Sequence, residues 1–474
     1  MKSVRLLVIT LFLFFLIVQN AQVATKKKSD KPNIVFILAD DLGYGDLGCY
    51  GHPYAKTAAI DSLAAEGTLF KEFYASGITS SPSRTGFMTG RYPARFKKLP
   101  KDYGFSDAET VTELLHRNGY KTGHFGKWHI GPESKSGTYG IDKIVVDEIV
   151  DRSDPRGRDA SIFDKAIDFI EKNQKKPFYI NIWTYSTHHP IGAQQGLKNN
   201  FEGLEVDVNL FSDYMQTKLQ ETKLLFGKIS PGMQLYMSEV FALDQQVQRI
   251  LEKLDGLGLS KNTIVVFSSD QGAVGSTNLT PKSLEELKGE ISKKGKLKFK
   301  KEELSLDDPE VQLYGNLLGY NGPLRGGKHD QYEGGVRIPF IIRWPGVIPA
   351  GKVNKSVIGA VDWLPTLSSL TGTVYHEHSI DGYDVSDIWM GSEKERTTPL
   401  FWKVSRKGGI ASLRSGDWKY HAKRKQHVGE LYNLKTDVGE KNNVAADNPQ
   451  LVSELRTLLK NWVESLPEEN GEKN

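Results

Sequence analysis

Cysteine is nearly absent from this chain, its net charge is close to zero, and no segment is repeated. Cys49 is the only cysteine among 474 residues, so no disulfide can form within the chain. The 62 lysine and arginine residues are spread along the sequence and nearly balance the 58 aspartate and glutamate residues. Nucleic-acid binding needs clustered positive charge, so this composition argues against it. With 38% hydrophobic residues, a chain of this length can form one large domain and a smaller one.

Long apolar runs are also missing, except at the amino terminus. Lys2 and Arg5 precede the apolar run Leu6–Val18, and small residues follow it up to Ala24. This pattern predicts a secretory signal peptide over residues 1–24. The apolar run is shorter than the ~20 residues that a membrane span needs, so an uncleaved anchor is the weaker alternative. We expect a periplasmic or secreted protein with no membrane attachment after cleavage.

Acidic residues follow two strand-like segments that lie far apart in the sequence. Ile34–Ala39 runs into Asp40–Asp41, and Thr263–Phe267 runs into Asp270–Gln271. Both segments are continuous, apolar and β-rich, which is typical of strands buried on both faces. Ligand sites in α/β sheets lie at the carboxyl ends of strands, and adjacent carboxylates repel each other unless a cation lies between them. The alternative is a solvated turn with helix-capping aspartates.

A serine-rich segment, Ser80–Arg84, has the features of an anion site. Pro82 suits the first turn of a helix, because its missing N–H is not needed there. Ser80 would then lie beside a helix amino terminus, whose free N–H groups and dipole favour an anion. Arg84 would add a fixed positive charge. The alternative is a serine-rich helix cap without chemistry.

A glycine-flanked loop brings a lysine and a histidine after the predicted strand Lys121–Phe125. Lys127 and His129 alternate, so on an extended chain they would point the same way. Such a pair could supply a cation and a proton shuttle. Two surface residues without a role are the alternative.

Two further loops carry candidate site residues. His188 and His189 follow the predicted strand Phe178–Trp183, and His189 is the weaker candidate because neighbours on an extended chain point apart. Lys328 lies in a glycine-rich loop that also carries Arg325, and such loops suit the close approach of an oxyanion.

The rest of the chain predicts a division into two parts. Residues 25–372 alternate strand-like and helical segments, whereas residues 373–474 show short alternating segments and a closing helix. We therefore expect a large α/β domain and a small C-terminal domain with an antiparallel sheet. Residues 191–235 are expected to be irregular, and the lysine- and glutamate-rich residues 281–308 to form a solvated insertion.

At this point the motifs match a known family. Ser80–Arg84 resembles the sulfatase signature, in which cysteine or serine is followed by x-Pro-Ser-Arg and then by Thr-Gly and Gly-Arg. Further blocks resemble sulfatase motifs in the same order, and coverage runs from about Lys31 to Leu466: Asn33–Asp46, Gly119–His129, Ser269–Gly272, Leu324–Lys328, Glu333–Pro339, Leu413–Tyr420 and Glu430–Leu434.

The resemblance implies an alkaline-phosphatase-like α/β fold, with a large, mostly parallel sheet flanked by helices and a smaller C-terminal α+β domain. It also implies that a maturase oxidises Ser80 to formylglycine. One hydroxyl of the hydrated aldehyde attacks sulfur, and the other is deprotonated to expel sulfate. By motif position, one calcium ion would be bound by oxygen ligands from the modified Ser80, Asp40, Asp41, Asp270 and Gln271.

The same resemblance implies roles for the remaining site residues. Arg84 would hold the formylglycine and assist the metal site. Lys127 and Lys328 would bind the sulfate oxygens and stabilise charge in the transition state. His129 would assist turnover of the sulfated intermediate, and His188 would be the general acid for the leaving alcohol.

This sequence departs from the family pattern at two positions of the site. Serine at position 80 resembles the bacterial serine-type branch, which a radical-type enzyme matures, and Cys49 lies outside the motif. Gln271 stands where asparagine or histidine is more usual, and its longer side chain could shift the metal. Ala58–Ala59 also replaces the commoner Pro-Asn, with no clear catalytic consequence.

Three functions are compatible with these residues. The first is an exported, calcium-dependent sulfatase of a sulfated carbohydrate, an algal polysaccharide such as ulvan or carrageenan first and a host glycosaminoglycan next. The second is a phosphomonoester or phosphodiester hydrolase of the same superfamily, because phosphate is also tetrahedral. The third is a sulfated-glycan binding protein in which Ser80 stays unmodified.

We expect Ser80 to be modified in protein purified from its native source. The tryptic peptide Glu72–Arg84 should be lighter than its unmodified form by one pair of hydrogens, or occur as the hydrate of that species. Mass spectrometry of the digest measures this difference. An unmodified serine would contradict the mechanism and favour the binding protein.

Overall fold

The computed structural model describes residues 31–146, 153–189, 191–226, 228–276, 297–299, 302–304, 318–376, 380–403, 410–423 and 426–467. The predicted signal peptide and most of the predicted insertion at 281–308 lie outside these residues. Over the described ranges, no helix has the length and apolar character needed to cross a membrane.

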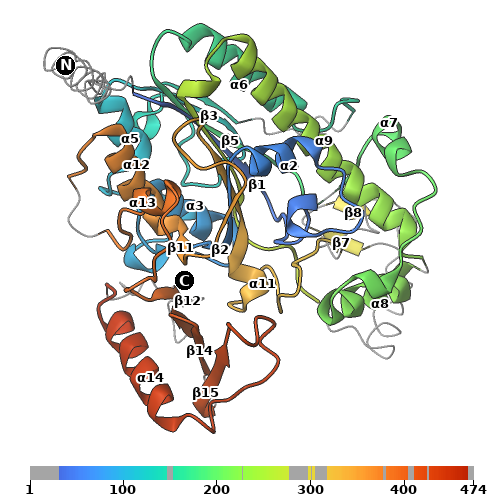
Figure 1. Cartoon of the computed structure of the whole chain (residues 1–474), viewed down its shortest axis with the longest axis vertical. Coiled ribbons are helices and arrows are strands. Elements are labelled where there is room, and N and C mark those ends of the chain that lie inside the picture. Colours follow the sequence, from blue (N-terminus) through green and yellow to red (C-terminus); the bar gives the residue numbers. More distant parts are fainter. Residues whose placement is uncertain are drawn as a thin grey trace, which may run out of the picture.

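The large part of the chain is built on a nine-stranded sheet with helices on both faces (Figure 1). The order along the sheet is β10 (Lys352–Asn354), β2 (Thr68–Tyr74), β9 (Arg337–Arg343), β6 (Thr263–Ser269), β1 (Asn33–Ala39), β5 (Phe178–Trp183), β3 (Lys121–Gly126) and β4 (Lys143–Val145), with β11 (Ile358–Gly359) paired to β2. Neighbouring strands are parallel except β9, which is antiparallel to β2 and β6. The predicted mostly parallel sheet is confirmed.

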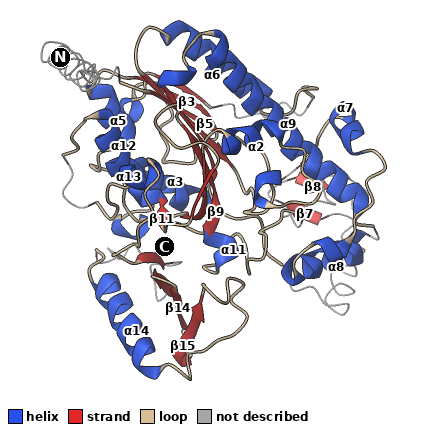
Figure 2. Cartoon of the chain, viewed as in Figure 1, coloured by secondary structure: helices blue, strands red, loops and turns tan. Residues whose placement is uncertain are grey.

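Both faces of β1 are covered, which explains its unbroken apolar sequence. Val35 and Ile37 belong to a core shared with α2 (Ala58–Ala65), α6 (Ala160–Asn173) and α9 (Ser230–Gly256). Ile34 and Phe36 face the opposite way, into a core shared with α3 (Ser80–Thr89), α5 (Val111–Arg117), α12 (Trp363–Thr371) and α13 (Ser386–Trp389). Figure 2 shows these two groups of helices on either side of the sheet.

The expectation that residues 191–235 are irregular is wrong. They contain α7 (Gln195–Lys198), α8 (Asp213–Phe226) and the start of α9. In α8, Met215 and Leu219 are buried four residues apart, and the polar residues Lys218, Glu221 and Thr222 are buried with them. Because polar residues share the buried face, the apolar helical period is weak in the sequence.

The C-terminal part has the predicted small antiparallel sheet. Its four strands are β12 (Leu400–Lys403), β13 (Ala411–Ser415), β14 (Trp418–Lys423) and β15 (Gln426–Asn433), followed by α14 (Pro449–Glu464). Leu455 and Leu459 of α14 share a core with Leu413 and Leu431 of the sheet. Short elements complete the described chain: α4 (Pro100–Tyr103), β7 (Leu297–Phe299), β8 (Glu302–Leu304) and α11 (Glu333–Val336).

Buried charged groups join the small sheet to the loop that precedes α11 and β9. Lys419 of β14 donates to Glu333 Oε1 at 2.9 Å, and both side chains are fully buried. Glu440 accepts the backbone N–H of Glu333 through Oε2 at 2.7 Å, and His421 Nε2 lies 2.8 Å from its Oε1. The Arg325 guanidinium donates to the Glu440 carbonyl at 2.8 Å. The C-terminal part therefore holds both ends of the loop between Arg325 and Glu333.

We expect Lys419→Met to lower the free energy of unfolding by about 3–5 kcal/mol, because the change leaves the buried Glu333 carboxylate without its main partner. Lys435→Met is the matched control, since Lys435 and Asp417 form an exposed pair at 4.0 Å in the turns beside the same sheet. The control should change stability little. Urea titration of both variants measures the difference, and equal losses would contradict this account.

Candidate active site

The acidic turns of the sheet come together because β1 and β6 are parallel neighbours. Ala39 is paired with Ser269, so the residues that follow each strand lie side by side. The backbone N–H of Asp270 donates to the Ala39 carbonyl at 3.0 Å. The backbone N–H of Asp41 donates to Asp270 Oδ1 at 3.1 Å. The structure thus brings together the four polar residues that the strand pattern placed at this edge, and all four are fully buried.

Ser80 is the first residue of α3 and points at this cluster. Its Oγ donates to Asp40 Oδ1 at 3.1 Å, and Lys127 Nζ and Gln271 Nε2 each lie 3.4 Å from the same oxygen. The turn into the helix is tight, because a Cβ on Gly77 would lie 2.3 Å from the Pro82 side chain. Because Ser80 is the first residue of α3, it lies beside the free backbone N–H groups of a helix amino terminus, which favour a bound anion.

Three basic side chains surround the carboxylates. Arg84, one helical turn after Ser80 in α3, is fully buried, and its Nη2 lies 3.0 Å from Asp270 Oδ2. The Trp183 ring lies under this guanidinium at 4.8 Å. Lys127 pairs with Asp40. Lys328 Nζ donates to Asp41 Oδ2 at 2.7 Å, since the Lys328 N–H is held by the Ala273 carbonyl at 2.9 Å.

The three carboxylates do not ionise equally. Burial alone would raise the pKa of Asp40, but neighbouring cationic groups, Lys127 foremost, outweigh burial and hold that pKa well below its usual range. Burial, and then the charge of Asp40, raise the pKa of Asp41 and of Asp270. Burial would lower the pKa of Lys328, but the charges of Asp41 and Asp40 raise it. Two acids are therefore held in an unfavourable environment that a cation would relieve.

The donor set fits a hard cation. Among the described residues, Gln271 Oε1 is a buried oxygen without a hydrogen-bond partner, although its Nε2 donates to Asp41. One ligand atom each of Asp40, Asp41 and His188 lie within 4.8 Å of one another. Carboxylate and amide oxygens suit calcium. His188 thus lies beside the donor set, and the ligands expected from the sequence are the oxygen-bearing residues.

The two histidine predictions that assumed extended chain are wrong in their geometry. The His188 and His189 rings do not point apart but stack, with centroids 4.4 Å apart, because the segment after β5 is a turn. Lys127 and His129 are not on a strand, since β3 ends at Gly126 and His129 has a left-handed φ of 56°.

Both predicted site histidines are neutral in the free protein. His188 Nε2 lies 3.8 Å from Asp41 Oδ2, and burial lowers the pKa of His188 to about 3. His129 lies at the surface of the site. Its pKa is lowered to about 4, first by desolvation and then by the charge of Lys127. An anion bound between them would favour the protonated forms.

Residues that support the site were missed by the sequence interpretation. Asp46 is buried and accepts the backbone N–H groups of Gly43 at 2.6 Å and Tyr320 at 2.7 Å, and the Tyr236 hydroxyl at 2.6 Å. Asp46 lies in the glycine-rich loop that follows Asp40 and Asp41, and this position could have marked it as a site residue. The turn that carries His188 is held by Arg158, Asp159 and Glu239. These residues lie far from His188 in the sequence, so no local pattern linked them to the site.

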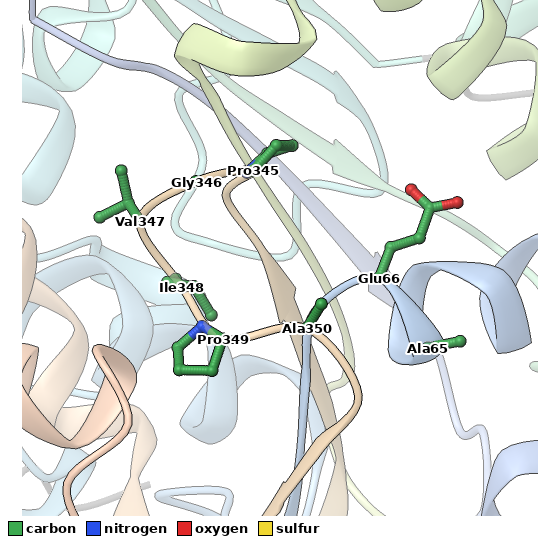
Figure 3. Close-up of a pocket in the computed structure, with 8 residues that line it drawn as sticks. All are labelled: Ala65, Glu66, Pro345, Gly346, Val347, Ile348, Pro349 and Ala350. Atoms are coloured by element: carbon green, nitrogen blue, oxygen red, sulfur yellow. The ribbon is translucent and has the colours of Figure 1, made fainter.

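A pocket elsewhere in the molecule carries no predicted site residue. It has a volume of about 620 Å³. Figure 3 shows its lining, Ala65, Glu66 and the turn 345–350. Because β9 runs antiparallel to β6 and pairs Arg343 with Val265, this turn lies at the opposite edge of the sheet from Asp270.

Known protein families account for this arrangement. A family model described as Sulfatase matches residues 32–373, and another, described as N-sulphoglucosamine sulphohydrolase, C-terminal, matches residues 327–468. The chain belongs to the sulfatase family. Membership identifies it as a sulfuric ester hydrolase.

Individual relatives of this sulfatase span nearly the whole chain. An N-acetylgalactosamine-6-O-sulfatase of Bacteroides thetaiotaomicron is 27% identical over 520 residues, which cover 93% of this chain and 95% of the relative. Arylsulfatase A of Homo sapiens is 28% identical over 507 residues, which cover 90% and 87%. The crystal structure of Ps i-CgsB in complex with k-i-k-neocarrahexaose has a TM-score of 0.71 at 25% identity and covers 93% of this chain and 96% of that one. The alkaline-phosphatase-like fold is confirmed.

We expect calcium at 100 times its Kd to raise the free energy of unfolding of the wild type by about 2.7 kcal/mol. Asp41→Asn and Asp270→Asn should gain little, because each removes a charged oxygen ligand. Asparagine tolerates the left-handed φ of 63° at position 41, so the backbone should be kept. Thermal and urea unfolding with and without calcium measure the gain, and an equal gain in all three proteins would contradict a site at this cluster.

Proposed function

We propose that this sulfatase is exported, binds calcium and removes sulfate from a sulfated carbohydrate through a formylglycine made from Ser80. The observation that carries the proposal is the place of Ser80 Oγ, at a helix amino terminus and within 3.4 Å of Asp40, Lys127 and Gln271. A nucleophile there would meet an anionic sulfate among fixed positive charges.

The absent groups would be held by residues of the cluster. Asp40, Asp41, Asp270, Gln271 and the modified Ser80 would hold calcium, which supplies a positive charge beside the reacting oxygens. Formylglycine supplies a nucleophilic hydroxyl together with a second hydroxyl, so that sulfate can be released.

The other side chains act on the substrate and on the nucleophile. Lys127 and Lys328 would bind the sulfate oxygens, and Arg84 would hold the nucleophile in place from within the core. His188 would donate a proton to the leaving alcohol. The bound sulfate would raise the pKa of His188 toward the operating pH, where a general acid works best. His129 would assist turnover from the surface of the site.

Names of relatives favour a carbohydrate substrate. The similar solved structure was determined with k-i-k-neocarrahexaose bound, and the Bacteroides relative is named for N-acetylgalactosamine sulfate. We therefore infer an algal polysaccharide of carrageenan type first, with ulvan as the related candidate and a glycosaminoglycan next. A serine-type maturase is the implied partner.

Export and domain division are part of the same proposal. The signal peptide at residues 1–24 would direct the chain to the periplasm or the medium, where such polysaccharides occur. Residues 25–372 would form the catalytic domain and residues 373–474 the small domain.

We expect protein produced with a serine-type maturase to release sulfate from carrageenan oligosaccharides, and Ser80→Ala to reduce kcat/KM on the order of 10⁴-fold or more, because the nucleophile is lost. Sulfate release is measured by ion chromatography, with glycosaminoglycan oligosaccharides compared in parallel. Ser81→Ala is the matched control, since this neighbouring serine is equally buried and has no proposed role.

Sulfate and phosphate esters of one aryl alcohol separate the remaining alternatives. Preference for the sulfate ester supports the proposal, and preference for the phosphate ester would replace it with a phosphoester hydrolase. Binding of sulfated oligosaccharide without release of sulfate would replace it with a binding protein.

A further inference from the structure

The turn that carries His188 is fixed to the end of β1 by its backbone. The N–H of Thr184 donates to the Leu38 carbonyl at 3.0 Å. The Asp40 N–H donates to the Ser186 carbonyl at 2.9 Å, and the Thr187 N–H donates to the Asp40 carbonyl at 2.7 Å. One side of this turn is therefore held by the end of β1 and by Asp40 of the acidic cluster.

Two charged residues before α6 hold the other side of the turn. Arg158 Nη2 donates to the carbonyls of Tyr185 at 2.6 Å and His188 at 2.7 Å. Asp159 accepts the backbone N–H of Tyr185 through Oδ1 at 2.8 Å and that of Ser186 through Oδ2 at 3.0 Å. These contacts fix the backbone on both sides of the imidazole-bearing residue.

Glu239 of α9 joins the same group from a second helix. Its Oε2 accepts the Ser186 hydroxyl at 3.1 Å and lies 3.3 Å from Arg158 Nε, while its Oε1 accepts the Gly192 N–H at 3.0 Å. The exposed fraction is 6% for Arg158 and 2% for Glu239, so neither side chain is placed to meet a substrate.

The chemistry of this buried group suits positioning better than stability. A buried ion pair seldom stabilises a fold more than apolar residues of the same shape would, because its desolvation is costly. A guanidinium, however, presents several N–H groups in a rigid plane and can hold two carbonyls and a carboxylate in fixed directions, whereas the three donors of a lysine rotate about one nitrogen. The pair of Arg158 and Glu239 thus fixes the backbone of the turn that carries His188, although burying the two charges costs desolvation free energy.

We propose that Arg158 and Glu239, with Asp159, are positioning residues that hold His188 for proton donation to the leaving alcohol. The inference rests on the proposed role of His188 as general acid. Displacement of a reacting group by about 1 Å is enough to lower a rate roughly 10²-fold. The group should therefore matter most for substrates whose leaving alcohol needs the proton.

Arg158→Lys tests this, because it keeps the charge and loses the fork of donors. We expect kcat/KM for a sulfated sugar to fall about 100-fold. For 4-nitrophenyl sulfate, whose leaving group departs without a proton, we expect a loss of less than about threefold. Glu239→Gln is made in parallel, so that the test survives if one variant does not fold.

Arg396→Lys is the matched control. Arg396 is also buried and holds Asp362 through two bonds of 2.6 and 3.2 Å, away from the turn of His188. This variant should affect both substrates by the same factor. If Arg158→Lys and Glu239→Gln also lower kcat/KM equally for the two substrates, the positioning role is overturned.

His188→Ala separates this inference from the function on which it rests. A loss confined to the sulfated sugar in His188→Ala and in Arg158→Lys supports both. Such a loss in His188→Ala, with a uniform loss in Arg158→Lys, overturns the positioning role alone. A uniform loss in His188→Ala overturns the general-acid role and this inference with it.

Discussion

Repulsion among three carboxylates buried at one edge of the sheet is the constraint on which the rest of the site depends. These acids are Asp40, Asp41 and Asp270. They follow two paired parallel strands, and this pairing keeps them close together. Arg84, Lys127 and Lys328 offset this charge, so the cluster has no net formal charge when all three acids are ionised. A divalent cation would make it positive by two charges, and an anionic sulfate ester would partly neutralise that excess. The acids thus prepare a site for an anion by way of a cation.

The charged groups of the site come from strand ends, from α3 and from connecting loops. Strand ends and the first turn of α3 supply the carboxylates and Arg84, and the sheet holds these positions between two cores. The connection between β5 and α9 adds His188 without belonging to the sheet. Relatives that keep the strand ends can therefore act on different sulfated molecules, which is why the family is clear and the sugar is a proposal.

Sequence reasoning was accurate where local pattern determines structure. The apolar runs before Asp40 and Asp270 are strands because both faces are buried, and Pro82 lies in the first turn of α3, where its missing N–H is not needed. It was wrong where contacts between residues far apart in sequence determine the local conformation. The stacking of His188 on His189 depends on a turn held by residues before α6 and by α9, and in α8 buried polar residues interrupt the apolar pattern. Contacts between residues far apart in sequence leave no local trace.

The buried charges between Glu333, Lys419 and Glu440 give the small domain a part in the site. Lys328 lies in the loop whose two ends those charges hold, together with Arg325. The C-terminal sheet is consequently not an exchangeable module, because a sheet from a relative would need to bring matching charges at every buried position. The loop that carries Lys328 is therefore anchored on the large sheet through Ala273 and on the small domain through Glu440.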